Sequence, residues 1–445
     1  GSQAGENITS AYGNVAIGYD ALNSEDAHGA NVCIGRSALT TLNAGADGHN
    51  VAIGYFAAYP QTTGTNNTVV GSEAGYALTT ATRNTAIGYQ ALYTEDANGN
   101  NTAIGAQALR TQDGGDNNVA VGHQAGYALT TADQCIIIGG YAGDSLTTGS
   151  DTTIVGYNAG QAITTASKNT IVGSAAGTTI TGIGNTVMGY HAATSGTLAA
   201  AYNIIIGYEA GKNKTTGDEA VMIGNNASSS ATGATQITTV GGHAGRYNTG
   251  NANTAVGYFA LSGPSSGTCN GTDNTAIGKE AGKAITTGDN NTIIGANAGD
   301  ALTTGENCTI IGHDAAASAV GAADEITLGD SNVDTLRCAT QTISSLSDKR
   351  DKKDIKDSTY GLDFVDSLKP VIFEWDRRDG AKKDLKDIGF VAQDLQEVDD
   401  EYTRLVYESN PEKLEATYGR LIPIMAKAIQ ELSAEVKELK KQING

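Results

Sequence analysis

Two residues five positions apart, Ser347 and Lys352, could perform covalent chemistry. A serine hydroxyl beside an uncharged lysine amine is a nucleophile and general-base pair that needs no histidine. Both lie in the charged run S-D-K-R-D-K, with Asp348 and Arg350 between them. Lys352 must lose its proton to act: burial and the neighbouring cations favour the neutral amine, whereas the nearby aspartates favour the ammonium. Taken alone, the spacing is also typical of a solvated charged linker.

Other residue types that carry metal or redox chemistry show no such pattern. The six histidines lack metal-ligand spacing. The five cysteines are odd in number, far apart and without a Cys-x-x-Cys pair, so we interpret them as free thiols: Cys33, Cys135, Cys269, Cys308 and Cys338. We therefore expect no metal and no cofactor.

Composition excludes several classes of protein. The net charge of −20 repels phosphate backbones, so nucleic acid is not an expected partner. The 58 glycines show no three-residue period and come with only 5 prolines, which excludes collagen. No stretch approaches the roughly 18 to 20 apolar residues of a membrane span, no signal peptide is visible, and the Gly1-Ser2 start is typical of a cloning remnant.

The chain divides near residue 340 into two unlike parts. Residues 1–340 carry 10 + 26 = 36 charges and 53 glycines, whereas residues 341–445 carry 18 + 22 = 40 charges and 5 glycines. Such a break in composition predicts a domain boundary.

The first part is one repeat that ends in glycine. Its phrase is Asn-x-x-aliphatic-Gly or a variant without the Asn, and its glycines span 311 residues in 18 intervals, a mean near 17.3. A fixed period of this length predicts a solenoid. The glycines are Gly18, Gly35, Gly54, Gly71, Gly88, Gly105, Gly122, Gly139, Gly156, Gly173, Gly189, Gly207, Gly224, Gly241, Gly257, Gly278, Gly295, Gly312 and Gly329.

The residues before each glycine predict a short strand that is apolar on both faces. Ile17 and Val15 share one face, while Ala16 points the other way. One face packs inside the coil and the other needs a second cover, which we infer to be a neighbouring chain. We expect two short strands per turn, about nineteen turns of 17 residues, and a rod on the order of 90 Å long.

Three further columns describe the turn. Ala stands three places after the glycine in eighteen of nineteen copies, which indicates a sterically tight position. Asn opens thirteen copies, and its stacked amides are expected to bond one another and the bend backbone. Tyr or His often follows the glycine, as at Tyr19 and His123; these rings could stack on sugars, but we favour rings that cover the coil edge.

The phrases NTAIGYQAL (84–92), NVAIGYDAL (14–22) and NTAVGYFAL (253–261) resemble the head repeats of trimeric autotransporter adhesins. That resemblance implies a trimeric β-roll. The 17-residue period is longer than the usual turn of that family.

Four ordered motifs in the second part resemble the self-cleaving intramolecular chaperone domain of phage tail fibres and tailspikes. They are S-D-K-R-D-K-K-D-I (347–355), L-K-P-V-I-F-E-W (368–375), I-G-F-V-A-Q-D-L-Q-E-V (388–398) and Y-G-R-L-I-P-I-M-A-K-A-I-Q-E-L (418–432). The resemblance implies trimerisation, chaperoning of the preceding β-fibre, and cleavage of the Leu346–Ser347 bond. It makes Ser347 the nucleophile and Lys352 the base, with Asp348 and Arg350 in support.

The last segment carries a heptad seam. Apolar residues recur at alternating steps of three and four with Glu and Lys outside them, which predicts a short coiled coil. The seam residues are Ile422, Met425, Ile429, Leu432, Val436, Leu439 and Ile443.

These features predict a mainly β protein in three parts. Residues 1–340 form a trimeric β-solenoid, residues 341–417 a small α+β chaperone and autopeptidase domain, and residues 418–445 a trimeric coiled coil. The expected role is a homotrimeric tail fibre in the virion that attaches to a host-surface glycan or protein receptor and to an upstream fibre or baseplate protein. The alternatives are a cell-surface adhesin with the same release domain and a glycan-cleaving tailspike, which the lack of paired carboxylates disfavours.

Overall fold

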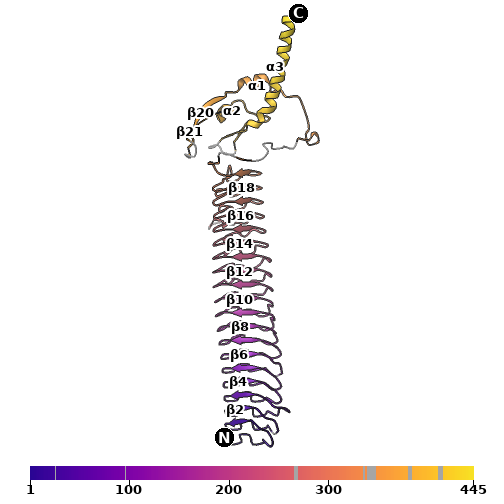
Figure 1. Ribbon diagram of the computed structural model, residues 1–445, viewed down its shortest axis with the longest axis vertical. Helices are drawn as coiled ribbons and strands as arrows, with labels where there is room; N and C mark the ends of the chain where they lie inside the picture. Colours follow the sequence, from indigo (N-terminus) through magenta and orange to yellow (C-terminus); the bar gives the residue numbers. More distant parts are fainter. Residues whose placement is uncertain are drawn as a thin grey trace.

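The computed structural model shows a long rod of stacked coils followed by a smaller C-terminal part that ends in a projecting helix (Figure 1). The structure describes residues 1–445 except 26, 96, 265–268, 334–335, 338–346, 379–382, 409–413 and 445. Leu346 and Cys338, both named above, lie outside the described residues. No helix within the described ranges is long and apolar enough to cross a membrane.

In the described part of the rod there are nineteen three-residue strands, each paired in parallel with the next. Equivalent residues pair directly, so Val15 lies beside Val32 and Ala16 beside Cys33. The strands are β1 (Val15–Ile17), β2 (Val32–Ile34), β3 (Val51–Ile53), β4 (Thr68–Val70), β5 (Thr85–Ile87), β6 (Thr102–Ile104), β7 (Val119–Val121), β8 (Ile136–Ile138), β9 (Thr153–Val155), β10 (Thr170–Val172), β11 (Thr186–Met188), β12 (Ile204–Ile206), β13 (Val221–Ile223), β14 (Thr238–Val240), β15 (Thr254–Val256), β16 (Thr275–Ile277), β17 (Thr292–Ile294), β18 (Thr309–Ile311) and β19 (Ile326–Leu328).

The middle residue of each strand points into the coil. Ala103, Ile137 and Ile154 are fully buried, and so are the alanines three places after each glycine, such as Ala108. The strand residues on either side of the middle one point outward, where Ile104 and Ile138 are exposed and many of their counterparts are partly buried. The expected alternation is thus confirmed, and the outer face is the one that the coil leaves uncovered.

Each turn has one strand and not the two we expected. Three residues in a typical turn have left-handed backbone, as shown by Gln107 (φ 61°), Leu109 (φ 48°) and Asn117 (φ 60°). Corners this frequent leave no straight run for a second strand. In the described residues only isolated bridges occur there, at Ile180–Leu198, Asn248–Cys269 and Glu306–Ala323.

The glycine that closes each phrase is required by stacking. Gly54 has φ +138°, and a Cβ there would lie 2.3 Å from the carbonyl oxygen of Gly71 in the next turn. An L-residue at this position would therefore be strained and would push adjacent turns apart.

The asparagine ladder forms, but mainly between side chains and backbone. The Asn101 Oδ1 accepts from the Asn118 N–H at 2.9 Å, and the Asn118 Nδ2 donates to the Ala132 carbonyl at 2.8 Å. Direct amide-to-amide bonds up the column occur at Asn203–Asn185 and Asn291–Asn274. Each amide thus satisfies backbone groups of the next turn, where the backbone would otherwise be buried without partners.

The C-terminal part is a small α+β unit. It contains η1 (Lys349–Asp351), α1 (Leu362–Ser367), β20 (Val371–Asp376), β21 (Lys383–Gly389), α2 (Ala392–Gln396), β22 (Val406–Tyr407), β23 (Glu415–Ala416), η2 (Tyr418–Arg420) and α3 (Leu421–Asn444). Strands β20 and β21 pair antiparallel, as do β22 and β23. A separate core joins α2, β22 and the start of α3 through Leu395, Leu405, Val406, Leu421 and Ile424.

Candidate functional site

Ser347 and Lys352 are brought together by a single turn of 3-10 helix. They flank η1, and the Lys352 Nζ donates to the Ser347 Oγ at 2.6 Å and lies 3.4 Å from the Ser347 carbonyl oxygen. Both residues are exposed. Only a neutral Lys352 amine can act as a base, and in that state the Ser347 hydroxyl donates to it.

Asp348 and Arg350 close the turn that holds this pair. Asp348 is the N-cap of η1, and its Oδ1 accepts from the Arg350 N–H at 2.8 Å. The Arg350 Nη2 lies 2.6 Å from the Asp348 Oδ2. These bonds hold the pKa of Asp348 below its usual range, the side-chain bond to Arg350 contributing most. The Asp348 carboxylate is therefore engaged by Arg350.

The four sequence motifs fall on distinct elements of the C-terminal part. The first covers the dyad and η1, the second leads into β20, the third joins the end of β21 to α2, and the fourth covers η2 and the start of α3. The predicted cleavage site includes Leu346, which lies outside the described residues, so the structure positions the hydroxyl and the amine but not the bond that they are predicted to cut.

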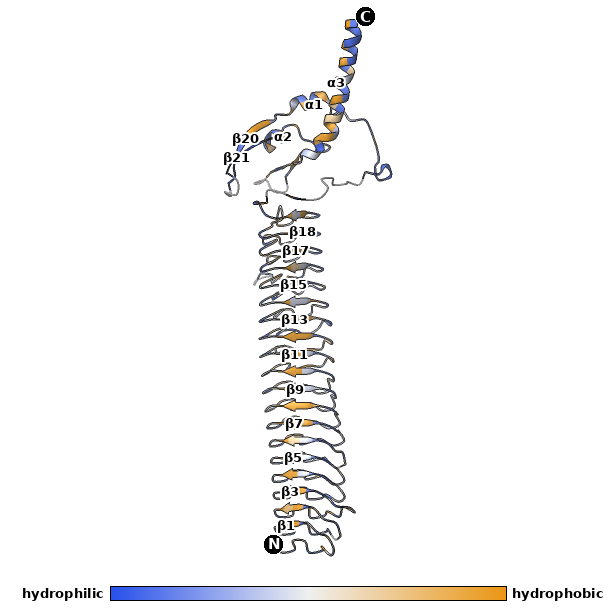
Figure 2. Cartoon of the chain, viewed as in Figure 1, coloured by the Kyte–Doolittle hydropathy of each residue, from blue (hydrophilic) through white to orange (hydrophobic). Residues whose placement is uncertain are grey.

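Helix α3 carries the predicted seam on a free face. All seven seam residues are exposed, Ile429 by 67% and Ile422 by 64%. The buried residues Leu421, Ile424 and Ala428 lie on another face of the helix, toward the small core. Hydrophobic and hydrophilic residues alternate along the projecting helix in Figure 2.

The rod carries a second free apolar surface. Hydrophobic strands follow one another along its length in Figure 2. The outward residues of this strand face are exposed: Val15, Ile17, Ile87, Ile104, Ile136, Ile138, Met188, Ile204, Ile277, Ile311, Ile326 and Leu328. We call these residues the outer strand row. Tyr19, Tyr89 and Tyr157, from the column after the glycine, are also exposed.

Within the described ranges, no group of three or more His, Cys, Asp or Glu side chains is arranged to hold a metal ion. Cys33, Cys135 and Cys308 are free thiols, and these three and Cys269 are buried. Cys135 replaces an asparagine of the ladder, and its Sγ donates to the Gly149 carbonyl at 3.2 Å. Burial raises the pKa of Cys135 to about 11, so this thiol is a structural group.

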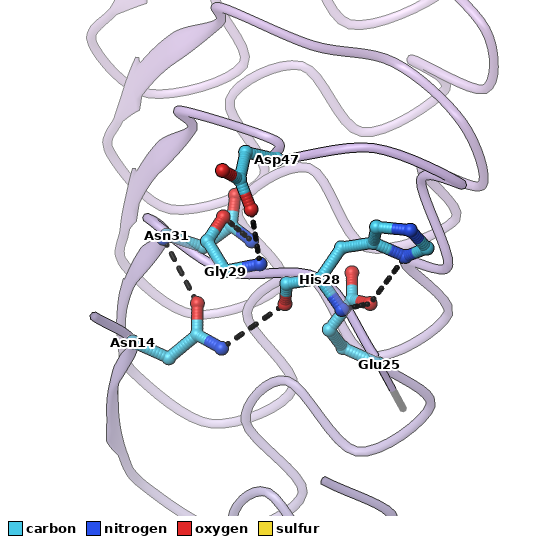
Figure 3. Close-up of polar contacts among 6 residues, drawn as sticks. All are labelled: Asn14, Glu25, His28, Gly29, Asn31 and Asp47. Atoms are coloured by element: carbon cyan, nitrogen blue, oxygen red, sulfur yellow. Dashed lines mark hydrogen bonds and ion pairs between the residues drawn. The ribbon is translucent and has the colours of Figure 1, made fainter. Parts of the chain in front are cut away.

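Sequence reasoning missed a buried carboxylate near the start of the rod (Figure 3). Glu25 is fully buried, and its Oε1 accepts from the His28 N–H at 3.0 Å. The Asp47 Oδ1 accepts from the Gly29 N–H at 3.0 Å, and the Asn14 Nδ2 donates to the His28 carbonyl at 3.2 Å. These contacts hold the backbone of His28 and Gly29 in place. The phrase E-D-A-x-G, present at 25–29 and again at 95–99, was the available signal.

Lys214 was also missed. It is fully buried at the interior position that Leu129 and Leu146 occupy in other turns, and its Nζ donates to the Ala234 carbonyl. Burial lowers the pKa of Lys214 to about 8. The sequence signal for Lys214 was a lysine at a repeat position that is apolar in other copies.

The two parts together define a long parallel β-solenoid followed by a small α+β unit that bears a Ser–Lys pair at its start. Residues 347–406, from the dyad serine to β22, match a family model described as the chaperone of endosialidase. Comparison with curated proteins and with solved structures gave no match. The C-terminal segment is thus similar to that chaperone, and the solenoid is a separate region upstream of it.

Proposed function

We propose that this chain is a segment of a phage-type tail fibre that assembles as a homotrimer, is folded by its C-terminal chaperone segment, and is then cut at Leu346–Ser347. The observation that carries the proposal is the presence of two uncovered apolar stripes, the outer strand row and the α3 seam, on one chain that also holds the Ser–Lys pair. An exposed apolar surface this extended is uncommon on monomeric proteins and marks an interaction site.

The two stripes have different roles in assembly. Solenoid turns that are nearly identical permit register slips of one repeat between chains. The α3 seam is short and its order of residues does not repeat from heptad to heptad, so it aligns the three C-termini before the rods pack along the outer strand row. A C-terminal nucleus thus sets the register for the whole fibre.

The proposed cleavage uses the hydroxyl of the residue after the scissile bond. The neutral Lys352 amine takes the proton from the Ser347 Oγ, which attacks the carbonyl carbon of Leu346. The C–N bond then breaks, the nitrogen of Ser347 receives a proton, and an ester links Leu346 to the Ser347 Oγ. Water hydrolyses this ester to give a carboxylate at Leu346 and a free amine at Ser347.

Cleavage has a physical purpose in this scheme. It removes the folding nucleus after the rod has formed, so the assembled fibre is trapped kinetically as well as stabilised by its contacts. The rod then serves as the attachment device, with a host-surface glycan or protein as receptor and an upstream fibre or baseplate protein at its other end. The resemblance of the repeats to adhesin heads keeps a cell-surface adhesin as the second candidate.

Intact-mass measurement of the purified protein, together with its native mass, tests this proposal. We expect two pieces, one ending at Leu346 and one beginning at Ser347, and a trimeric rod. Ser347→Ala and Lys352→Ala should each remain a single full-length chain. Lys356→Ala, which removes an exposed lysine of the same segment, is the matched control and should be cut normally. Equal processing of wild type and both dyad variants would refute the dyad.

A further inference from the structure

Besides the seam, helix α3 has a second face that contacts the small domain. Leu421, Ile424, Ala428 and Glu431 follow one another at steps of three, four and three, which places them on one side of the helix. The first three are buried against the small domain. Glu431 is the last of this series and the one that carries a charge.

Glu431 contacts the start of α1. Its Oε2 accepts from the Leu362 N–H at 2.7 Å, and its Oε1 lies 3.3 Å from the Lys427 Nζ. The N-cap of α1 is Gly361, which has no side chain to fill this role. A Cβ at Gly361 would lie 2.0 Å from the Glu431 Oε2, so the glycine leaves room for the carboxylate.

The residue before this contact is also anchored. The Tyr360 hydroxyl donates to the Asp400 Oδ2 at 2.5 Å, and its ring packs edge-on against Phe364 at 5.5 Å. The exposed residues 353–359 connect this point to Lys352. The chain that follows the dyad is therefore anchored at Tyr360 to the small domain and at Leu362, through Glu431, to the helix that carries the seam.

We propose that Glu431 is a positioning residue for autocleavage: by holding the Leu362 N–H it ties the dyad segment to the assembly helix, so that pairing of the seams places the three dyads. This inference rests on the proposed autocleavage and adds the contact that couples it to assembly. The rate of such a reaction depends strongly on the position of the reacting groups. Displacement of the dyad segment should therefore slow cleavage even when Ser347 and Lys352 are intact.

Time courses of cleavage of the full chain, followed by intact mass alongside native mass, test this. Glu431→Ala should form the same oligomer as wild type but be cut about tenfold more slowly or worse. Glu431→Gln keeps a carbonyl acceptor for the Leu362 N–H and should restore most of the rate. Glu438→Ala removes a carboxylate of the same helix that pairs with Lys441 and should be cut like wild type.

Gly361→Ala supplies an independent perturbation of the same contact. Its added methyl displaces the carboxylate, so it should slow cleavage about as much as Glu431→Ala, and the double variant should be no slower than either single one. Wild-type rates in an assembled Glu431→Ala variant would overturn the inference, as would loss of assembly in that variant or a failure of Glu431→Gln to restore the rate. A wild-type chain that stays whole would instead refute the proposed autocleavage, and this inference with it.

Discussion

At the scale of single residues, the charged run around the dyad is organised by one ion pair. Asp348 and Arg350 satisfy each other across η1, and their contact leaves the Lys352 amine directed at Ser347. The acidic and basic residues near Lys352 in the sequence therefore do not all act equally on its amine. Sequence could name these residues, but only the turn decides which carboxylate has a partner.

Lys214 allows a prediction on pH and stability. Its pKa of about 8 in the folded rod lies below the ordinary 10.5, so between these values the unfolded chain binds more protons. Stability should therefore rise as pH rises from about 8 to 10.5, and the destabilisation should be complete below pH 8. Lys214→Met should stabilise the rod at pH 7 by on the order of 2 to 3 kcal/mol.

Denaturation midpoints of wild type and Lys214→Met at pH 7 and pH 10 check this prediction. The difference in stability between the two proteins should become smaller at pH 10. Because this difference is compared, and not each midpoint alone, the effects of other groups that titrate there cancel. Lys212→Met is the control, because Lys212 lies at the surface and pairs with Glu209 at 2.9 Å. A gap that is independent of pH would contradict the assigned burial effect.

At the scale of elements, the asparagine ladder holds adjacent turns together. The Asn118 Oδ1 accepts from the Cys135 N–H at 2.9 Å, and its Nδ2 donates to the Ala132 carbonyl at 2.8 Å. Asn118→Ala would leave both backbone groups buried without these hydrogen bonds. We expect a loss of about 2 to 4 kcal/mol, since each unsatisfied buried group costs about 1 to 3 kcal/mol.

Hydrogen exchange at the Cys135 amide gives the local readout for Asn118→Ala. Exchange should speed up there and in the adjoining turns, while distant turns change little because solenoid turns depend mainly on their neighbours. Asn225→Ala, at an exposed position outside the ladder, should leave exchange unaltered. Unchanged protection of Cys135 in the ladder variant would show that the side-chain bond contributes little.

The turn itself was only partly predictable from sequence. Alternation in Val15–Ile17 and the recurring glycines correctly indicated a solenoid whose strands are apolar on both faces, but they did not show which face lies inside the coil. The second strand per turn was wrong because left-handed residues such as Gln107 and Leu109 are not glycines, so composition alone did not reveal the corners. The Glu431 contact to Leu362 joins residues 69 positions apart, and no local pattern encodes such a pairing.

At the scale of the whole molecule, the α3 seam should control assembly. Ile429→Glu places a charge in the free apolar face, so seam pairing should fail, the native mass should fall to that of a single chain, and the Leu346–Ser347 bond should stay intact. Light scattering and intact mass measure the two effects. Ala434→Glu adds the same charge at an exposed position off the seam and should assemble normally. A trimer that survives Ile429→Glu would show that the rod assembles without the helix.

The in-register pairing of equivalent residues, such as Val15 with Val32, has a consequence for the history of this protein. Each turn presents the same backbone donors and acceptors to the next turn. Loss or duplication of a whole 17-residue unit therefore brings together two turns that can still pair. Recombination between near-identical repeats can thus lengthen or shorten the shaft in steps of about 4.8 Å while both ends stay intact. Reach becomes a trait that selection can adjust independently of what the ends recognise.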